Sequence, residues 1–182
     1  GEIVAFLDDV AYPKTDWLNR ALKHFKDVKV IAVGGPAMTP LNNSVLQKAS
    51  GAAFESYIGG GGTRNRHLPV GKIHEIDDWP SVNLLIRRNA FLKTGGYNPK
   101  FWPGEDTELC LGLMKFGKLI YDPKVQVYHN RRASLLKHLR QTGNYGLHRG
   151  HFAKKFPQTS LKLFYIIPSL FSLYLIVGLI FE

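Results

Sequence analysis

Near its end the chain contains an uninterrupted run of uncharged, mostly apolar residues. The run extends from Leu163 to Phe181 and is dominated by Leu, Ile, Phe and Tyr. A helix needs ~20 such residues to cross the hydrocarbon core of a bilayer, and Pro168 is tolerated near the start of such a helix. We therefore predict a transmembrane helix over 163–181. A buried core helix is the alternative, although a run that is apolar on every side favours the membrane.

Positive charge accumulates ahead of this run. The 182-residue chain has a formal net charge of +10, and no acidic residue lies between Asp122 and Glu182. Leucines interleaved with basic residues predict an amphipathic, basic segment over 131–162 that lies along an anionic lipid surface. Gly143 and Gly146 argue against one continuous helix there.

The same charge has two further interpretations. Basic residues next to a membrane span mark its cytoplasmic side, so we expect the remainder of the chain to face the cytoplasm at the plasma membrane. A nucleic-acid-binding domain is the competing interpretation of a strongly basic chain. The adjoining apolar run explains the charge without it, so no nucleic-acid partner is expected.

Three acidic residues stand at the start of a predicted amphipathic helix that follows a break at Gly104. Acids in a first turn stabilise a helix through its dipole by ~0.3–1 kcal/mol each, so capping alone explains them as well as a functional site does. The indole of Trp102 beside them favours a site that holds a sugar and moves a proton. The three acids are Glu105, Asp106 and Glu108, of which the last is assigned to capping.

Two further acids, Asp8 and Asp9, directly follow a predicted strand over 3–7. Ligands of open α/β sheets bind in the crevice outside the carboxyl ends of strands, and adjacent carboxylates there can hold a Mg²⁺ ion that bridges phosphate oxygens. An Asx-type turn ahead of Pro13 explains the same residues without a ligand. His129 ends another predicted strand and is a further candidate contact to metal or phosphate, although a lone histidine is more often structural.

Alternating strand and helix signals predict an α/β fold over residues 1–130. Further short apolar runs indicate strands near 28–33, 82–88 and 119–121. Another helix is expected to begin at Thr15 or Asp16.

Three motifs in register resemble family-2 inverting glycosyltransferases: Phe6 to Pro13, Asn83 to Tyr97 and Gly104 to Leu109. Their order and spacing match across nearly the whole part that precedes the apolar run. The basic stretch from Arg131 to Lys155 looks like that of membrane-attached members that build cell-surface glycans. The resemblance implies the C-terminal part of a GT-A type α/β domain, with a mixed sheet and flanking helices, followed by a transmembrane helix.

The resemblance also implies an activity. A hexosyltransferase-like enzyme would transfer a sugar from a nucleotide-sugar donor to a hydroxyl of a lipid-linked or polysaccharide acceptor, in one in-line step with inversion. Asp106 matches the catalytic base, with Glu105 beside it, and Asp8 and Asp9 occupy the motif that holds a divalent metal, Mg²⁺ or Mn²⁺, with the donor diphosphate. The remaining candidates, for the sugar or the leaving diphosphate, are Asn83, Trp102, Arg131, Arg132 and His129.

Two departures from the family pattern support an alternative function. Val10 stands where the family commonly has a third acid, so metal coordination falls to Asp8 or Asp9 with water or His129. The family's N-terminal half, with its nucleotide-base pocket, has no counterpart in the sequence, and we expect residues 1–182 to be inactive by themselves. The alternative is a catalytically inactive, membrane-anchored binding module derived from such an enzyme.

Overall fold

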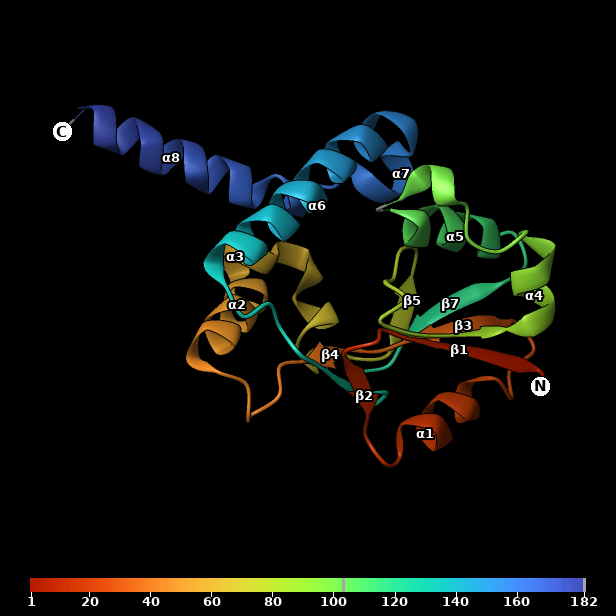
Figure 1. Ribbon diagram of the computed structural model, residues 1–182. Helices are drawn as coiled ribbons and strands as arrows, with labels where there is room; N and C mark the ends of the chain where they lie inside the picture. The colour runs from red at the N-terminus through yellow and green to blue at the C-terminus, as the bar shows by residue number, and fades with distance from the viewer. Residues whose placement is uncertain (103, 182) are drawn as a thin grey trace.

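A mixed five-stranded sheet forms the centre of the computed structural model, which describes residues 1–102 and 104–181 (Figure 1). In sheet order the strands are β1 (Ile3–Leu7), β6 (Asn83–Arg87), β3 (Val30–Gly34), β7 (Lys118–Tyr121) and β5 (His74–Ile76). β3 and β7 run parallel, and the other neighbours are antiparallel. The predicted α/β class with a mixed sheet is confirmed.

A second, three-stranded sheet joins the start of the chain to residues near 130. It consists of β2 (Ala11–Pro13), β8 (Val127–His129) and β4 (Ala37–Met38). β2 and β8 are antiparallel, which places Ala11 opposite His129. The N–H of Asn130 also donates to the carbonyl of Val10 at 3.1 Å. The loop that follows β1 is therefore held against the end of β8.

Helices cover both faces of the five-stranded sheet. α1 (Trp17–His24) lies on one face, and α4 (Arg88–Lys93) and α5 (Glu105–Leu113) lie on the other (Figure 1). Side chains of β6 alternate between the two: Leu84 packs in the cluster that contains Leu109 of α5, and Leu85 in the cluster that contains Trp17 of α1. Burial on both faces explains why the three central residues of this strand, Leu84, Leu85 and Ile86, are all apolar.

The segment between the two sheets' strands β4 and β5 is largely helical, and a short turn precedes α5. α2 (Val45–Glu55) begins at a capping box, in which Gln47 N–H donates to Ser44 Oγ at 3.4 Å and Ser44 N–H to Gln47 Oε1 at 3.0 Å. α3 (Tyr57–Gly60) and the 3₁₀ turn η1 (Gly61–Arg66) follow it. A further 3₁₀ turn, η2 (Pro99–Phe101), precedes α5.

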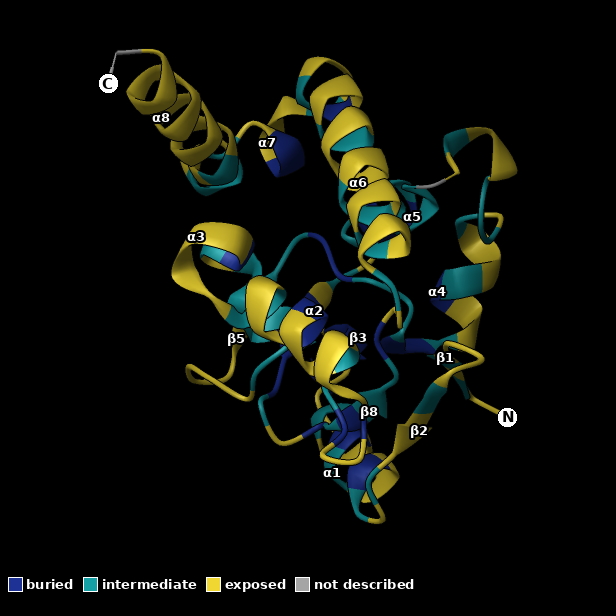
Figure 2. Ribbon diagram, turned by 60° about the vertical axis from the view of Figure 1, so that its left-hand side comes forward, coloured by how far each residue is buried: buried dark blue, intermediate teal, exposed yellow. Residues whose placement is uncertain are grey.

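The basic segment forms one continuous helix, α6 (Leu135–Lys155), of 21 residues. The prediction that Gly143 and Gly146 would interrupt it is wrong. Both glycines face open space, so neither kinks the helix against a neighbour, and the cost of ~1 kcal/mol for each exposed glycine is outweighed by the remaining helix and by the burial of Phe152. Figure 2 shows that much of the outer surface of α6 is exposed.

The C-terminal apolar run divides into two short elements after α7 (Pro157–Ser160). They are the 3₁₀ turn η3 (Leu163–Tyr165) and the helix α8 (Ile167–Phe181), which has 15 residues. At 1.5 Å per residue such a helix is about 22 Å long, shorter than the hydrocarbon core of ~30 Å. Over residues 1–102 and 104–181, no helix is long and apolar enough to span a membrane, so the predicted transmembrane helix over 163–181 is not found.

Candidate active site

The acids at the start of α5 have different roles. Glu105 Oε2 accepts a hydrogen bond from the N–H of Gly104 at 2.7 Å, so this carboxylate caps its own helix. Asp106 does not take part in capping. Its Oδ1 atom is buried and has no hydrogen-bond partner within residues 1–102 and 104–181. A buried polar atom without a partner is rare in folded proteins and marks a place where a ligand or water binds.

The environment of Asp106 suits a general base. Burial, together with the charges of Glu105 and Asp78, raises the pKa of this carboxyl from 3.8 to about 6, although the hydroxyl and N–H of Ser81 oppose the rise. A base works best when its pKa lies near the pH at which it operates. Asp106 is therefore ionised at neutral pH and basic enough to take a proton.

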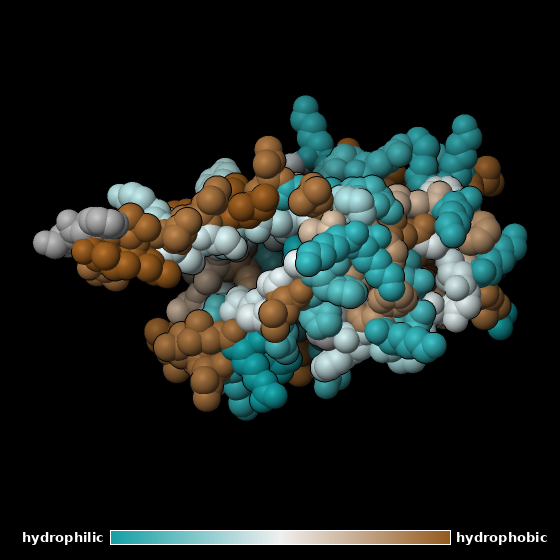
Figure 3. Space-filling model, turned by 90° about the horizontal axis from the view of Figure 1, so that it is seen from above, coloured by the Kyte–Doolittle hydropathy of each residue, from teal (hydrophilic) through white to brown (hydrophobic). Residues whose placement is uncertain are grey.

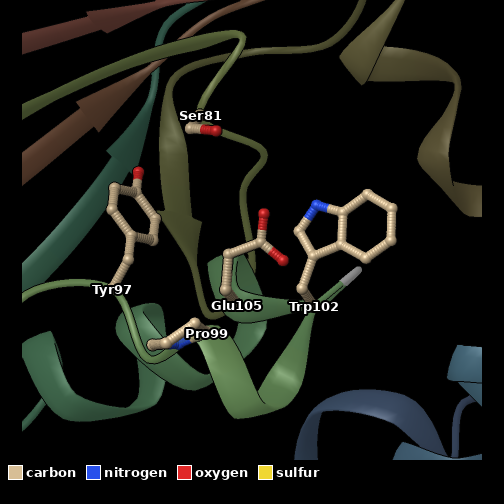
Figure 4. A pocket seen from close by; sticks show the side chains of 5 residues that line it. All are labelled: Ser81, Tyr97, Pro99, Trp102 and Glu105. Atoms are coloured by element: carbon tan, nitrogen blue, oxygen red, sulfur yellow. The ribbon is translucent and has the colours of Figure 1, made fainter.

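A pocket of about 320 Å³ opens at the start of α5, where Glu105, the residue before Asp106, lines it. The residues that line it are Ser81, Tyr97, Pro99, Trp102 and Glu105 (Figure 4). Its volume is at the lower end of the range for small-molecule sites. The indole of Trp102 stands at the mouth, with 69% of the residue exposed. The structure thus brings Trp102 and Glu105 to one pocket, with Asp106 next to Glu105 in the first turn of α5.

A second acidic group lies where β1 ends. Asp8 Oδ1 accepts the N–H of Val10 at 3.2 Å, which is the Asx-type turn that the sequence allowed. Asp8 Oδ2 lies 3.6 Å from Nε2 of His129, because β2 pairs with β8 directly after the turn. Asp8, Asp9 and His129 therefore stand together.

The two carboxylates of this group have opposite pKa shifts. Burial acts to raise the pKa of Asp8, but bonds from Asp9 and Val10 and the proximity of His129 lower it. The bond and charge of Asp8 raise the pKa of Asp9. Burial, together with the charge of Arg131, lowers the pKa of His129, so the imidazole is neutral at neutral pH.

Asp8, Asp9 and His129 do not form a complete binding site for a divalent cation, but the two carboxylates supply part of one. Within residues 1–102 and 104–181, no three His, Cys, Asp or Glu side chains converge closely enough to enclose a metal ion. Mg²⁺ is commonly held by one or two carboxylates, with substrate phosphates and water completing its shell. Asp8 and Asp9 meet that smaller requirement, because they are adjacent and both oxygen donors.

Asn83 lies in the core rather than on a ligand surface. The side chain is fully buried. Its Oδ1 accepts from the indole N–H of Trp17 at 2.8 Å, and its Nδ2 donates to the carbonyl of Val125 at 2.7 Å and to that of Pro36 at 3.3 Å. The predicted sugar contact through this amide has no support in the geometry, since both ends of the amide are already bonded within the protein.

The two arginines that follow β8, Arg131 and Arg132, have different environments. Arg131 is 7% exposed, and its guanidinium donates to the carbonyl of Ala37 at 2.6 Å and to Thr39 Oγ1 at 3.1 Å. It therefore holds the second sheet to the segment before α2. Arg132 is exposed, and its charge acts on His129. Of this pair, Arg132 is the one available to an anionic ligand.

Helix α6 lies across the start of α5. The aromatic ring of Phe152 packs against Gly104 so closely that a Cβ atom there would stand 2.2 Å from it. Tyr145, nearer the start of α6, is 53% exposed, and its hydroxyl accepts a hydrogen bond from the amide of Gln141 at 3.0 Å.

A buried ion-pair cluster, which we call the Asp78 cluster, fastens α6 in this position. Asp78 is 5% exposed. Its Oδ2 lies 3.0 Å from Arg149 of α6 and 3.1 Å from Arg66 of η1, and its Oδ1 accepts the hydroxyl of Thr107 at 3.0 Å. Despite burial, the two arginines hold the pKa of Asp78 below its ordinary value.

The preceding residue repeats this arrangement nearer the surface, where Asp77 pairs with Lys162 at 2.6 Å. Sequence reasoning missed both pairs. Asp77 and Asp78 find their partners 85 and 71 residues further along the chain, at Lys162 and Arg149, and no local pattern predicts contacts over such separations.

The fold and the site describe an α/β protein with an enclosed carboxylate beside a sugar-sized pocket and a separate carboxylate pair at a strand end. No family model matches the chain. Over 163 residues it is 29% identical to the pre-mycofactocin glycosyltransferase of Mycobacterium tuberculosis strains CDC 1551 and H37Rv, covering 89% of this chain and 34% of that protein. Over 111 residues it is 35% identical to the succinoglycan biosynthesis protein ExoA of Rhizobium meliloti strain 1021, covering 60% of this chain and 32% of that protein. The chain thus spans about a third of the length of these relatives.

Proposed function

We propose that the protein containing this chain is a glycosyltransferase that transfers a sugar, with inversion, from a nucleotide-sugar donor to a glycan or lipid-linked hydroxyl. The observation that carries the proposal is Asp106, an enclosed carboxylate with an unpartnered oxygen beside a pocket of about 320 Å³. The similarity to two proteins named for glycosyl transfer and for succinoglycan biosynthesis supports the same reaction class.

In the proposed reaction Asp106 is the general base. It accepts the proton of the acceptor hydroxyl while the hydroxyl oxygen forms a bond to the anomeric carbon of the donor. The bond from that carbon to the diphosphate oxygen breaks on the opposite side, and its electron pair leaves with the diphosphate. Because the attack and departure are in line, the anomeric configuration inverts.

The group at the end of β1 would receive the leaving diphosphate. A Mg²⁺ or Mn²⁺ ion held by Asp8 and Asp9 would supply positive charge to the diphosphate oxygens. The neutral imidazole of His129 lies against Asp8 and can orient its carboxylate. Arg132, which is exposed nearby, adds a cation without a metal.

The reaction can be tested with the whole protein, a panel of labelled nucleotide sugars and an extract of the host's glycans. We expect one donor to give a labelled product whose new linkage has the opposite anomeric configuration, as read by NMR. EDTA should abolish transfer and Mn²⁺ or Mg²⁺ should restore it. A product with retained configuration, or transfer that is insensitive to EDTA, would contradict the proposed mechanism or the proposed metal.

The second candidate function is a catalytically inactive binding module. It is favoured by Val10, which stands where family-2 glycosyltransferases commonly have a third acid. The two functions differ in one experiment. Calorimetry on the whole protein with nucleoside diphosphates and Mn²⁺ should show binding in both cases. Only the enzyme should also consume the nucleotide sugar, so binding without turnover across the donor panel would favour the module.

We also propose that α6 and α8 contact a membrane surface on its cytoplasmic side. α8 extends away from the body and presents apolar side chains on its exposed surface (Figure 3). The first turns of α6 combine exposed Leu135, Leu136 and Leu139 with exposed Lys137 and Arg140. Apolar side chains next to cations suit the boundary between acyl chains and anionic headgroups.

Vesicle sedimentation tests this surface. The chain should bind vesicles of phosphatidylcholine with phosphatidylserine more tightly than vesicles of phosphatidylcholine alone. Replacing Lys137 and Arg140 by Gln should weaken binding about fivefold per residue, since each cation near an anionic surface contributes ~1 kcal/mol. The matched control replaces Lys23 and Lys26, on the side of the sheet away from α6 (Figure 1). An equal loss in both variants would reject a specific role for α6.

A further inference from the structure

The pocket beside Asp106 contains a second unsatisfied group. The hydroxyl oxygen of Tyr97 is buried and has no hydrogen-bond partner among residues 1–102 and 104–181, and Asp106 Oδ1 is in the same state. Tyr97 lines the pocket directly, and its pKa is raised by burial and by the charge of Asp106. The charge of Asp106 acts on Tyr97, so the two unpartnered groups lie near one another. They are complementary, because a phenol donates a hydrogen bond and a carboxylate accepts one.

Ser81 lies close to both groups. Its hydroxyl acts on the pKa values of both Tyr97 and Asp106, which places it beside each of them. In Figure 4 Ser81 and Tyr97 stand on one side of the pocket, and Trp102 stands on the other, beyond Glu105. The site thus has hydroxyl groups along one wall and a flat apolar ring along another.

A sugar ring matches this distribution of groups. Its C–H face packs against an aromatic ring, and its hydroxyls, which occur on adjacent carbons, each both donate and accept hydrogen bonds. The ring of Tyr97 is fixed by packing against Phe6 and Phe91, with centroid distances of 5.2 Å and 5.9 Å. Its hydroxyl is therefore held in place before a ligand arrives.

We propose that this pocket selects an acceptor with two neighbouring hydroxyls on a sugar ring: Asp106 takes the proton of one, and Tyr97 donates a hydrogen bond to the other. The inference rests on the proposed glycosyltransferase function and narrows its acceptor to a sugar. An acceptor with a single hydroxyl and no neighbouring acceptor atom, such as a serine side chain, satisfies Asp106 and leaves the Tyr97 hydroxyl without a partner.

The test uses the whole protein and p-nitrophenyl glycosides as acceptor probes, each compared with its mono-deoxy forms. Tyr97→Phe removes only the hydroxyl. We expect it to raise the KM for the intact glycoside about tenfold, the usual effect of losing one hydrogen bond to a neutral partner, with little change in kcat. The deoxy probe that lacks the neighbouring hydroxyl should show the same loss with the wild-type protein and no further loss with Tyr97→Phe, because the two changes remove one bond.

A second tyrosine provides the matched control. Tyr121 is fully buried, and its hydroxyl donates to the carbonyl of Val70 at 2.9 Å. Tyr121→Phe should lower the melting temperature by roughly 2–4 °C, because it leaves that carbonyl without its partner, and should leave the acceptor KM unchanged. Tyr97→Phe should show the reverse, since its hydroxyl bonds to nothing in the described protein.

The outcomes separate this inference from the proposed function. Transfer to dodecyl phosphate or a serine peptide but to no glycoside would overturn the inference and leave a glycosyltransferase. Additive losses for Tyr97→Phe and the deoxy probe would overturn it as well. Failure to consume any nucleotide sugar would overturn the proposed function and the inference with it.

Discussion

Replacing Asp106 by asparagine should reduce sugar transfer by the whole protein by about 10²–10⁴-fold, the usual contribution of a general base. The amide has the same shape but cannot take the acceptor proton. The measurement is kcat with the donor identified from the labelled panel. The wild-type rate should also fall as the pH falls through about 6, where Asp106 becomes protonated, and this acid limb should be absent from any residual activity of the variant.

Two controls show whether the loss comes from chemistry. An acid whose pKa is raised in the folded state destabilises that state once it is ionised, so Asp106→Asn should be at least as stable as the wild type at neutral pH. Glu108→Gln changes an acid in the same turn of α5 and should retain near-normal transfer. A rate within about tenfold of wild type for Asp106→Asn would remove this residue from the role of base.

Replacing Asp78 by alanine should lower the free energy of unfolding by about 3–5 kcal/mol, because it leaves two partly buried cations, Arg66 and Arg149, without their shared carboxylate. For a chain of this size the melting temperature should fall by roughly 6–20 °C. Thermal unfolding followed by circular dichroism measures it. Because the folded pKa of Asp78 lies below its ordinary value of 3.8, the stabilisation is complete above that pH and is lost as the pH falls below it.

The neighbouring acid supplies the control for this prediction. Asp77→Ala removes an ion pair in which the Asp77 side chain is 38% exposed and that of Lys162 is 28% exposed. Pairs at such positions contribute about 0–1 kcal/mol, because water screens them. If Asp78→Ala lowers the melting temperature no more than Asp77→Ala does, the cluster does not fasten α6 as the structure indicates.

The elements that the sequence predicted well are those specified by their own residues. β1 is a short apolar run that is followed by two acids. α5 begins directly after a glycine, Gly104, and has apolar residues at helical spacing. These local signals indicate only in part that Asp106 differs in role from Glu105 and Glu108. Its burial and unpartnered oxygen depend on Ser81 and Tyr97, whose approach no spacing in the sequence reveals.

The parts that could not be predicted depend on partners that are distant in the sequence. β2 and β8 have three residues each, too few to show a period of two, and they are strands because Ala11 meets His129. The amide of Asn83 has the donor and acceptor atoms that a sugar contact needs. In the fold, however, both ends of the amide are used in hydrogen bonds to Trp17 and Val125. Both results follow from tertiary contacts that override local pattern.

The contact between Gly104 and Phe152 has a consequence for how this protein can change over evolutionary time. Any side chain at position 104 would meet the ring of Phe152, and α6 would have to move off the start of the helix that carries Asp106. A single mutation at this glycine would therefore change the packing of α6 on the first turn of α5, two residues before Asp106, without altering Asp106 itself. Position 104 and position 152 are expected to vary only together, as a pair whose sizes must continue to match.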